Sequence, residues 1–317
     1  PLANGCPIRC GQPFFLKAFM NFRHFVLTVA FVASSALGTV NDTYAAEAVD
    51  AAQPKPVSQT AGTAYPVSNV RVLPELASLF SQEKKGRHGV VVLRRVDPES
   101  GATDIMTSDI CEAEKRYAPA STFKVPHSII ALELGVLPNE TENFFHYDGR
   151  SQYYLDAWER DMNLRDAVRL SNVEAFQVLA PRIGAERMRL MLERLHFGNA
   201  TVGSDIKQFW LDGSLKVSAI ELAGFFEALS RRTLPVAADV QNRVADIILL
   251  EEKAGLRLYG KTGYTGRKSG TGWFAGWVEE KGRICAFAVR LDLRNGTPLE
   301  ARQETAKAAL AAVGFWN

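Results

Sequence analysis

The sequence has almost no surplus of charge of either sign. Its 37 Lys and Arg residues nearly balance 35 Asp and Glu residues, which leaves a formal net charge of +2. It also has no run of Lys or Arg with aromatic residues between them, the pattern that binds a phosphate backbone. We therefore expect no nucleic acid among its partners.

Histidine and cysteine are also scarce, with five His and four Cys residues in 317. The His residues have no H-x-x-x-H or similar spacing, so we predict no metal site. Apart from Cys6 and Cys10 near the start, the cysteines are Cys111 and Cys285. Two cysteines do not make a disulfide framework. Either they pair, which an exported protein permits, or Cys285 packs as a small apolar residue inside a strand.

No apolar run is long enough to predict a membrane span, which needs about 20 residues. The run Phe25–Leu37 follows Met20 and a short basic region, and small residues lead from it to Ala45. This order is typical of a signal peptide over 20–45, although an uncleaved anchor is an alternative. Residues 1–19 have no such pattern, and we interpret them as a non-native upstream leader. We therefore predict a periplasmic protein that is not stably attached to a membrane after cleavage.

The chain changes character twice after the predicted cleavage site. Residues 46–69 are rich in Ala, Pro, Ser, Thr and Gln without apolar periodicity, which predicts a flexible linker. Residues 70–317 then form the predicted folded domain, long enough for a sizeable core. Within it, a short helix around Leu76 precedes two β-branched runs, Gly89–Arg95 and Thr103–Thr107, which predict an antiparallel hairpin.

The rest of the domain alternates between helical and strand patterns. In the middle, apolar residues recur at helical spacing from Met188 to Leu195. Further strands are predicted at 256–262, 272–279 and 283–292, and a last helix at 298–313. Strands at both ends with helices between them predict an α/β (α+β) fold: a central antiparallel sheet flanked by helices, with an inserted helical lobe.

A Ser-x-x-Lys motif stands at Ser121 and Lys124, where a helix is expected to begin. Three-residue spacing on a helix puts the hydroxyl and the amine on one face. A serine needs a neighbouring base to become a nucleophile, and a desolvated lysine can serve as that base. The alternative is a helix N-terminus whose Ser121 caps backbone N–H groups. Pro126 follows close enough to the first turn to be tolerated there.

Two further motifs follow in order. Ser171-Asn172-Val173 is an S-x-V sequence, and Lys261-Thr262-Gly263 is a K-T-G sequence, which alone would predict only a strand end turning at its glycine. S-x-x-K, a Ser-containing motif and K-T-G occur in this order in the penicillin-recognising serine enzymes, whose transpeptidase-like fold is then expected here.

The S-x-V motif makes the chain resemble the class D serine β-lactamases, or oxacillinases. The resemblance runs from about Gly89 to the C-terminus and includes collinear matches around Trp158, Phe197, Trp210 and Trp273. Phe197 stands where the family usually has Tyr, although Phe also occurs there. The family's substrate-binding Arg is matched by Arg302, with Arg294 as the alternative because extra residues precede Arg302.

The resemblance implies hydrolysis of the β-lactam ring of penicillin-type antibiotics, and hence β-lactam resistance. In the family, the lysine matching Lys124 reacts with carbon dioxide to give N6-carboxylysine, the base for acylation of Ser121 and for deacylation. Burial favours this chemistry because it lowers a lysine pKa and leaves a neutral amine. The side chains that could build this apolar pocket are Phe123, Val173, Phe176, Trp210 and Leu211. Trp210 could donate its indole N–H to the carboxyl group, or be an ordinary core residue.

The resemblance also assigns the remaining roles. Ser171 relays a proton to the departing nitrogen, and backbone N–H groups of Ser121 and Tyr264 form the oxyanion hole. The catalytic set is then Ser121, Lys124, Ser171 and Lys261. Thr262, Gly263, Arg302 and Trp158 are expected to bind substrate, with Arg302 and Lys261 holding its carboxylate. No cofactor other than carbon dioxide is implied, and the chain is expected to be a monomer or homodimer.

Other functions share these motifs. Penicillin-sensing receptor domains resemble class D enzymes but stay acylated, and they are attached to multi-pass membrane domains. Penicillin-binding proteins acting on cell-wall peptides are a second alternative. In a purely structural exported domain, the collinear motifs would be coincidence. Rapid turnover of the drug separates a lactamase from all three.

Overall fold

The fold is organised around one sheet, seen in the computed structural model, which describes residues 69–81, 87–294 and 296–316. The predicted leader, signal peptide and nearly all of the predicted linker lie outside the described residues. The sheet has the strand order β1-β3-β2-β7-β6-β5-β4. All neighbouring strands are antiparallel except β1 and β3. The strands are β1 Val70–Val72, β2 Gly89–Val96, β3 Thr103–Thr107, β4 Leu249–Lys253, β5 Leu256–Tyr264, β6 Thr271–Glu280 and β7 Arg283–Asp292.

Both faces of the sheet are buried, which explains why its central strands contain continuous apolar runs rather than alternating polar and apolar residues. In β2, Val90 and Val92 pack into a core on one face, whereas Val91 and Leu93 pack into a separate core on the other. The same alternation continues along β6 and β7. The register pairs β2 with β7, so segments from the two ends of the domain lie side by side.

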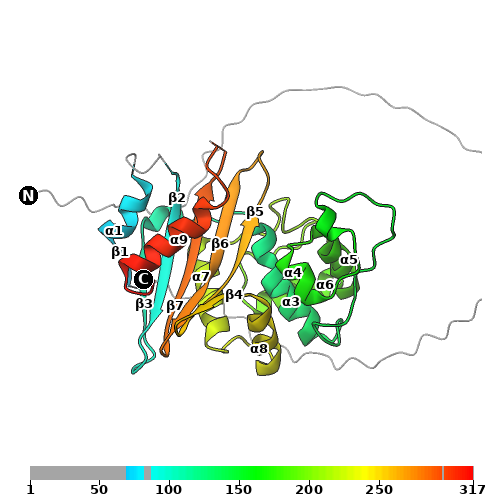
Figure 1. Ribbon diagram of the computed structural model, residues 1–317, viewed down its shortest axis with the longest axis horizontal. Coiled ribbons are helices and arrows are strands. Elements are labelled where there is room, and N and C mark those ends of the chain that lie inside the picture. Colours follow the sequence, from blue (N-terminus) through cyan, green and yellow to red (C-terminus); the bar gives the residue numbers. More distant parts are fainter. Residues whose placement is uncertain (1–68, 82–86, 295, 317) are drawn as a thin grey trace, which may run out of the picture. The chain divides into compact units, whose positions relative to one another are not determined.

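Helices cover each face (Figure 1). On one face, α9 (Ala301–Ala312) and the short α1 (Pro74–Ala77) close the smaller core. On the other lies α7 (Ala219–Ser230), which is apolar around most of its circumference, as expected for a fully buried helix. Ser218 and Glu221 form a capping box that fixes where α7 begins. The remaining α-helices are α2 Ile110–Glu114, α3 Lys124–Glu133, α4 Leu164–Arg169, α5 Val173–Ile183, α6 Ala185–Arg194 and α8 Ala238–Ile247.

The helical lobe, α3 to α6, lies beyond the β5 side of the sheet (Figure 1). The apolar stripe predicted on α6 is its core face, since Met188, Met191 and Leu192 are all buried. The predicted hairpin corresponds to β2 and β3, and the three predicted C-terminal strands to β5, β6 and β7. The last helix begins at Ala301, later than predicted, and β1 and β4 at the sheet edges were not predicted.

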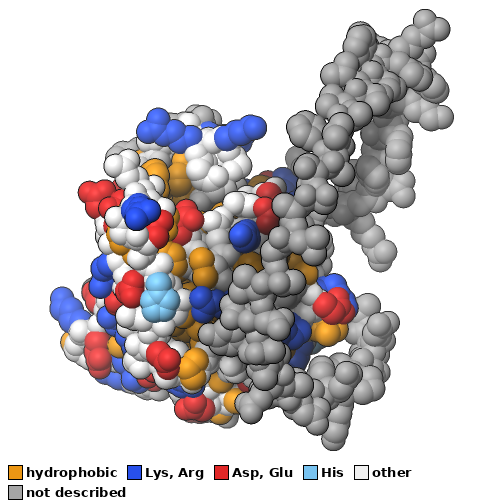
Figure 2. Space-filling view, turned by 90° about the vertical axis from the view of Figure 1, so that its right-hand side faces the viewer, with side chains coloured by type: hydrophobic (Ala, Val, Ile, Leu, Met, Phe, Trp, Pro, Cys, Tyr) orange, Lys and Arg blue, Asp and Glu red, His pale blue; other side chains and the backbone are white. Residues whose placement is uncertain are grey.

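The distribution of charge on the described surface agrees with the nearly equal numbers of acidic and basic residues in the sequence. Figure 2 shows acidic and basic side chains interspersed on the face it presents, rather than gathered into a patch of one sign. Within the described ranges, no helix is long and apolar enough to cross a membrane. Cys285 is buried in β7, as the interpretation of it as a small core residue predicted, and Cys111 is exposed on α2.

Candidate active site

The Ser-x-x-Lys motif lies where a short 3-10 helix, Ala120–Phe123, runs directly into α3. Lys124 Nζ donates a hydrogen bond to Ser121 Oγ over 3.1 Å. Ala120 takes up a left-handed backbone conformation with φ 49°, and its N–H bonds to the Trp210 carbonyl over 3.0 Å. Such strain in a residue other than glycine costs on the order of 1–3 kcal/mol and concentrates at functional sites. The predicted nucleophile and base are therefore in direct contact.

Lys124 is enclosed by apolar side chains, with an exposed fraction of 1%. Burial, and then the charge on Lys261, hold its pKa well below the ordinary lysine value. Its Nζ also lies 5.1 Å from the centroid of the Phe176 ring. Among the described residues no carboxylate lies within ion-pair distance of Lys124. A buried amine without an acidic partner is favoured in its neutral form, which can accept a proton or attack an electrophile.

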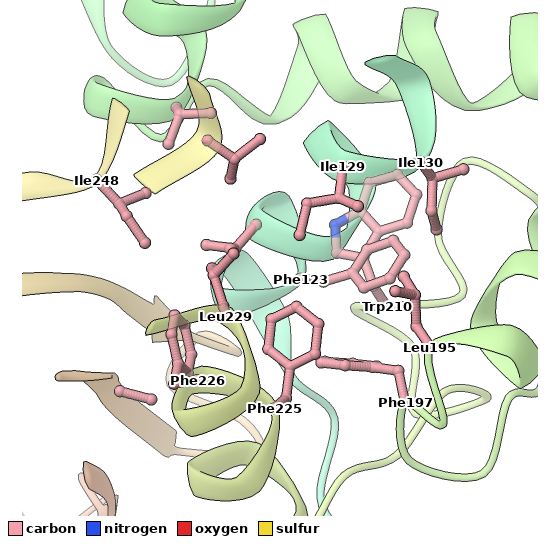
Figure 3. Packing of buried hydrophobic residues seen from close by; sticks show 14 of the residues in the cluster. Phe123, Ile129, Ile130, Leu195, Phe197, Trp210, Phe225, Phe226, Leu229 and Ile248 are labelled. Atoms are coloured by element: carbon pink, nitrogen blue, oxygen red, sulfur yellow. The ribbon is translucent and has the colours of Figure 1, made fainter. Parts of the chain in front are cut away.

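Phe123 and Trp210, two of the aromatic residues predicted to surround Lys124, lie next to each other in a buried cluster (Figure 3). Phe123 stacks on Trp210 with ring centroids 5.8 Å apart, and Phe197 lies 5.9 Å from Phe123. Phe197 is buried against Phe123 and Phe225, so this position contributes packing. Val173 and Leu211 are partly buried against the same core.

Ser171 is placed by the residue that follows it. Asn172 is the N-cap of α5, and its side chain accepts a hydrogen bond from the Ala175 N–H over 3.0 Å. Ser171 precedes this cap with φ 55°, and its Oγ accepts a hydrogen bond from Lys261 Nζ over 3.0 Å. Burial, and then the charge on Arg302, lower the Lys261 pKa to about 7. The second and third motifs therefore meet through this Ser–Lys pair.

The K-T-G strand approaches the Ser121 segment closely. Gly263 belongs to β5, and a Cβ added there would lie 2.9 Å from the Pro119 carbonyl oxygen and 3.2 Å from the Thr122 side chain. Any larger residue would push β5 away from the nucleophile. Thr262 and Tyr264 flank Gly263 and are half-buried, as is Ser121. The strand end thus brings the predicted oxyanion and substrate residues next to the nucleophile.

The two candidate arginines differ sharply in position. Arg302, in the first turn of α9, is 7% exposed, and its guanidinium donates a hydrogen bond over 2.8 Å to the Gly263 carbonyl. Its charge also acts on Lys261. Arg294 is exposed and forms an ion pair with Asp292, and its Nε lies 2.9 Å from a carboxylate oxygen of that residue. Arg302 is therefore the arginine that the fold brings to the K-T-G motif.

Trp158 lies at the edge of this group of residues. It is 6% exposed, and its indole N–H donates to the Leu170 carbonyl over 3.0 Å. This bond ties the loop carrying Trp158 to the residue before Ser171. The Tyr154 ring lies 6.3 Å from the Trp158 ring and is 89% exposed. Only part of the Trp158 ring is therefore left to meet a substrate.

One buried residue of the site was not predicted. His127 follows Lys124 by three residues, as Lys124 follows Ser121, so all three occupy one face of the helical segment. His127 is fully buried, with ring centroids 5.1 Å from Phe176 and 5.7 Å from Trp210. This repeated spacing was the signal that could have revealed it. No group of three or more His, Cys, Asp or Glu residues suited to a metal occurs in the described part of the chain.

The chain is similar to proteins of one family in both sequence and fold. Residues 84–311 match the family model of the penicillin binding protein transpeptidase domain. β-Lactamase OXA-10 of Pseudomonas aeruginosa is 36% identical over 220 residues, covering 68% of this chain and 80% of that protein. The crystal structure of FUS-1 (OXA-85), a class D β-lactamase from Fusobacterium nucleatum subsp. polymorphum, superimposes with a TM-score of 0.71 at 36% identity. The match covers 76% of this chain and 98% of that one. The chain belongs to the class D β-lactamases.

Membership in the class D β-lactamases confirms the resemblance inferred from S-x-V and the predicted transpeptidase-like fold. OXA-48 of Klebsiella pneumoniae adds a relative at 35% identity over 232 residues, with 84% of its length covered. The match to the family model, over residues 84–311, lies within residues 70–317.

Proposed function

We propose that this class D β-lactamase hydrolyses penicillin-type β-lactams through an acyl-enzyme on Ser121, and so gives β-lactam resistance. One observation carries the proposal: the Ser121 hydroxyl lies 3.1 Å from the amine of a fully buried lysine with no acidic partner among the described residues. A hydroxyl so paired can lose its proton as it attacks a carbonyl.

The surroundings of Lys124 fit the N6-carboxyl group expected from the family. A neutral amine is required for its nitrogen lone pair to attack carbon dioxide, and burial supports that form. The Trp210 indole N–H has no acceptor among the described residues, although the ring is only 1% exposed. It is therefore available to donate to a new oxygen on Lys124. When present, the carboxyl group supplies an anionic base beside Ser121.

The residues of the three motifs divide the acylation step between them. Ser121 Oγ forms a bond to the lactam carbonyl carbon and loses its proton to the base on Lys124. The developing oxyanion accepts hydrogen bonds from the backbone N–H groups of Ser121 and Tyr264. The lactam C–N bond then breaks, and the proton taken from Ser121 passes to the nitrogen through Ser171, which Lys261 holds by the bond over 3.0 Å, so that the base on Lys124 is again free to accept a proton. Water activated by the same base on Lys124 attacks the ester and frees Ser121.

We assign the binding of the substrate carboxylate to Arg302 and Lys261, the cationic side chains at the K-T-G motif. Arg302 can present its guanidinium beside Thr262 and Gly263, and Lys261 adds a second positive charge when protonated. Trp158 supplies an apolar edge for the rest of the drug. No metal takes part in this scheme, carbon dioxide is the only cofactor, and the active chain is a periplasmic monomer or homodimer.

Mass spectrometry of the purified protein mixed with a penicillin tests the function directly. We expect a covalent adduct on Ser121 that forms rapidly and disappears as hydrolysed product accumulates. An adduct that persists stoichiometrically would instead make the protein a penicillin sensor or a penicillin-binding protein.

Replacing Arg302 with Ala should raise KM for a penicillin by about 10- to 100-fold, because a charge-assisted hydrogen bond to the substrate carboxylate is lost. Its effect on kcat should be smaller. Arg294→Ala is the matched control and should leave both constants within about 2-fold, since Arg294 is paired with Asp292 at the surface. Steady-state kinetics of the two variants separate the arginines, and a larger KM effect at Arg294 would refute the assignment.

The low pKa of Lys261 has a consequence for stability. An unfolded lysine keeps its proton up to about pH 10.5, whereas folded Lys261 loses it near pH 7. Between these values the unfolded state binds more protons, so the contribution of Lys261 to stability rises with pH. We expect the free energy of unfolding of the wild type, measured relative to Lys261→Met, to increase across this window. A difference that is constant with pH would show that Lys261 is charged throughout.

A further inference from the structure

His127 is a buried polar residue without a role in the proposed cycle. Both of its ring nitrogens are inaccessible and have no hydrogen-bond partner among the described residues. Two arginines, Arg94 and Arg290, also have one unpartnered buried nitrogen each, but each donates a hydrogen bond through another nitrogen, Arg94 to Glu227 and Arg290 to Tyr117. His127 alone in that set has no side-chain hydrogen bond at all. Buried polar groups are nearly always paired, so this imidazole requires an explanation.

The surroundings of His127 restrict what its partner can be. The ring contacts Phe123, Phe176 and Trp210, whose side chains have no oxygen or bare nitrogen that could accept a hydrogen bond. Lys124, one helical turn earlier, shares Phe176 with it: Lys124 Nζ lies 5.1 Å from that ring centroid, and the His127 centroid also lies 5.1 Å from it. Lys124 is therefore a polar side chain that shares an aromatic neighbour with His127, and its charge, when present, acts on the imidazole.

The protonation state of the His127 ring determines whether it is a cation or a neutral imidazole with a single N–H to donate. Burial, above all, lowers the His127 pKa to about 3, and a proton on Lys124 acts in the same direction whenever it is present. At neutral pH the imidazole is uncharged and carries one N–H and one bare nitrogen. It therefore cannot act as an acid in the cycle, but it retains one hydrogen to donate.

We propose that His127 is a positioning residue that donates this N–H to the carboxyl group formed on Lys124. The proposal rests on the proposed function, because it requires that modification. In the modification, the Lys124 lone pair forms a bond to the carbon of carbon dioxide, one C–O π pair moves to oxygen, and the nitrogen releases a proton to solvent. Trp210 and His127 then approach the new anion with one donor each, which holds it beside Ser121 Oγ.

A hydrogen-bond donor at position 127 and a residue that only fills space would have different effects on the carboxylation of Lys124. A core residue would affect folding but not the affinity for carbon dioxide. A donor to the carboxyl group would stabilise the modified lysine selectively, by about 10- to 100-fold in affinity for a hydrogen bond to a charged group.

The test measures carboxylation itself rather than activity. The purified chain is freed of carbon dioxide, titrated with isotopically labelled bicarbonate, and followed by carbon NMR of the carbamate signal. We expect His127→Leu to weaken loading by about 10- to 100-fold relative to wild type. His127→Asn and His127→Gln place an amide donor at the two ring-nitrogen positions, and at least one should restore loading to within about 3-fold.

Wild-type protein supplies a second measurement that does not depend on a variant folding. Nitrogen NMR of histidine-labelled protein, with the His127 signal assigned from a variant that lacks it or by sequential assignment, should show that one ring nitrogen shifts as bicarbonate saturates Lys124. Equal loading in His127→Leu, or a His127 spectrum indifferent to bicarbonate, would overturn the inference. Absence of any carbamate signal in the wild type would instead overturn the proposed function of Lys124.

Discussion

Replacing Lys124 with Ala is expected to lower kcat for penicillin hydrolysis by about 10³- to 10⁴-fold, the usual contribution of a general base. The loss follows from the geometry, because Lys124 is the basic group that is hydrogen-bonded to Ser121 Oγ in the described part of the chain. Acylation should become slow, and deacylation should become slower still because it uses the same base. A penicillin adduct on Ser121 should therefore accumulate and persist in the variant.

The matched control is Lys307→Ala. Lys307 is 38% exposed and pairs with Glu251 at the surface, so its loss should leave kcat within about 2-fold. Removal of Lys124 also takes an amine out of an apolar pocket, so we expect the variant to remain folded by thermal denaturation. Turnover in a folded Lys124→Ala protein near the wild-type rate would mean that Lys124 is not the base.

Replacing Ser121 with Ala should have the largest effect of all, a fall in kcat on the order of 10⁵-fold or more, because the covalent route disappears. Unlike the Lys124 variant, this protein should form no adduct at any time, which intact-mass measurement detects directly. Ser100→Ala, in the turn between β2 and β3, is the control, since Ser100 is exposed and bonds only within that turn. An adduct on the Ser121→Ala protein would place the nucleophile elsewhere.

The sequence alone was sufficient to predict the helices and strands that have strong local patterns. β2 and β3 are β-branched runs separated by a turn, and α6 has a regular apolar stripe, so periodicity alone located them. β1 was missed because it is a short edge strand whose partner, Ile105–Thr107, is distant in the sequence. β4 pairs with Leu256–Tyr259 across a two-residue turn, but it was missed because its sequence, LLEEK, is rich in Glu and Lys, which are depleted in strands.

The motifs indicated the chemistry but not the full site. Ser121 and Lys124 were predictable because helical spacing fixes their contact, whereas the Ser171–Lys261 bond joins residues far apart in the sequence. The choice between Arg302 and Arg294 depended on where α9 begins, and only the fold determines that. His127 escaped notice because a single histidine in an apolar helix is usually an ordinary core residue, and its spacing from Lys124 gained meaning only with its unpartnered nitrogens.

The central claim is that a buried, neutral Lys124 reacts with carbon dioxide to become the base of a hydrolytic cycle. Its most direct test is steady-state hydrolysis of a chromogenic penicillin by the purified protein, first depleted of carbon dioxide and then supplied with bicarbonate. The account predicts that turnover is low after depletion, rises with bicarbonate to a saturating rate, and shows no such rise in Lys124→Ala. A single stoichiometric acylation without turnover, with bicarbonate present, would contradict it.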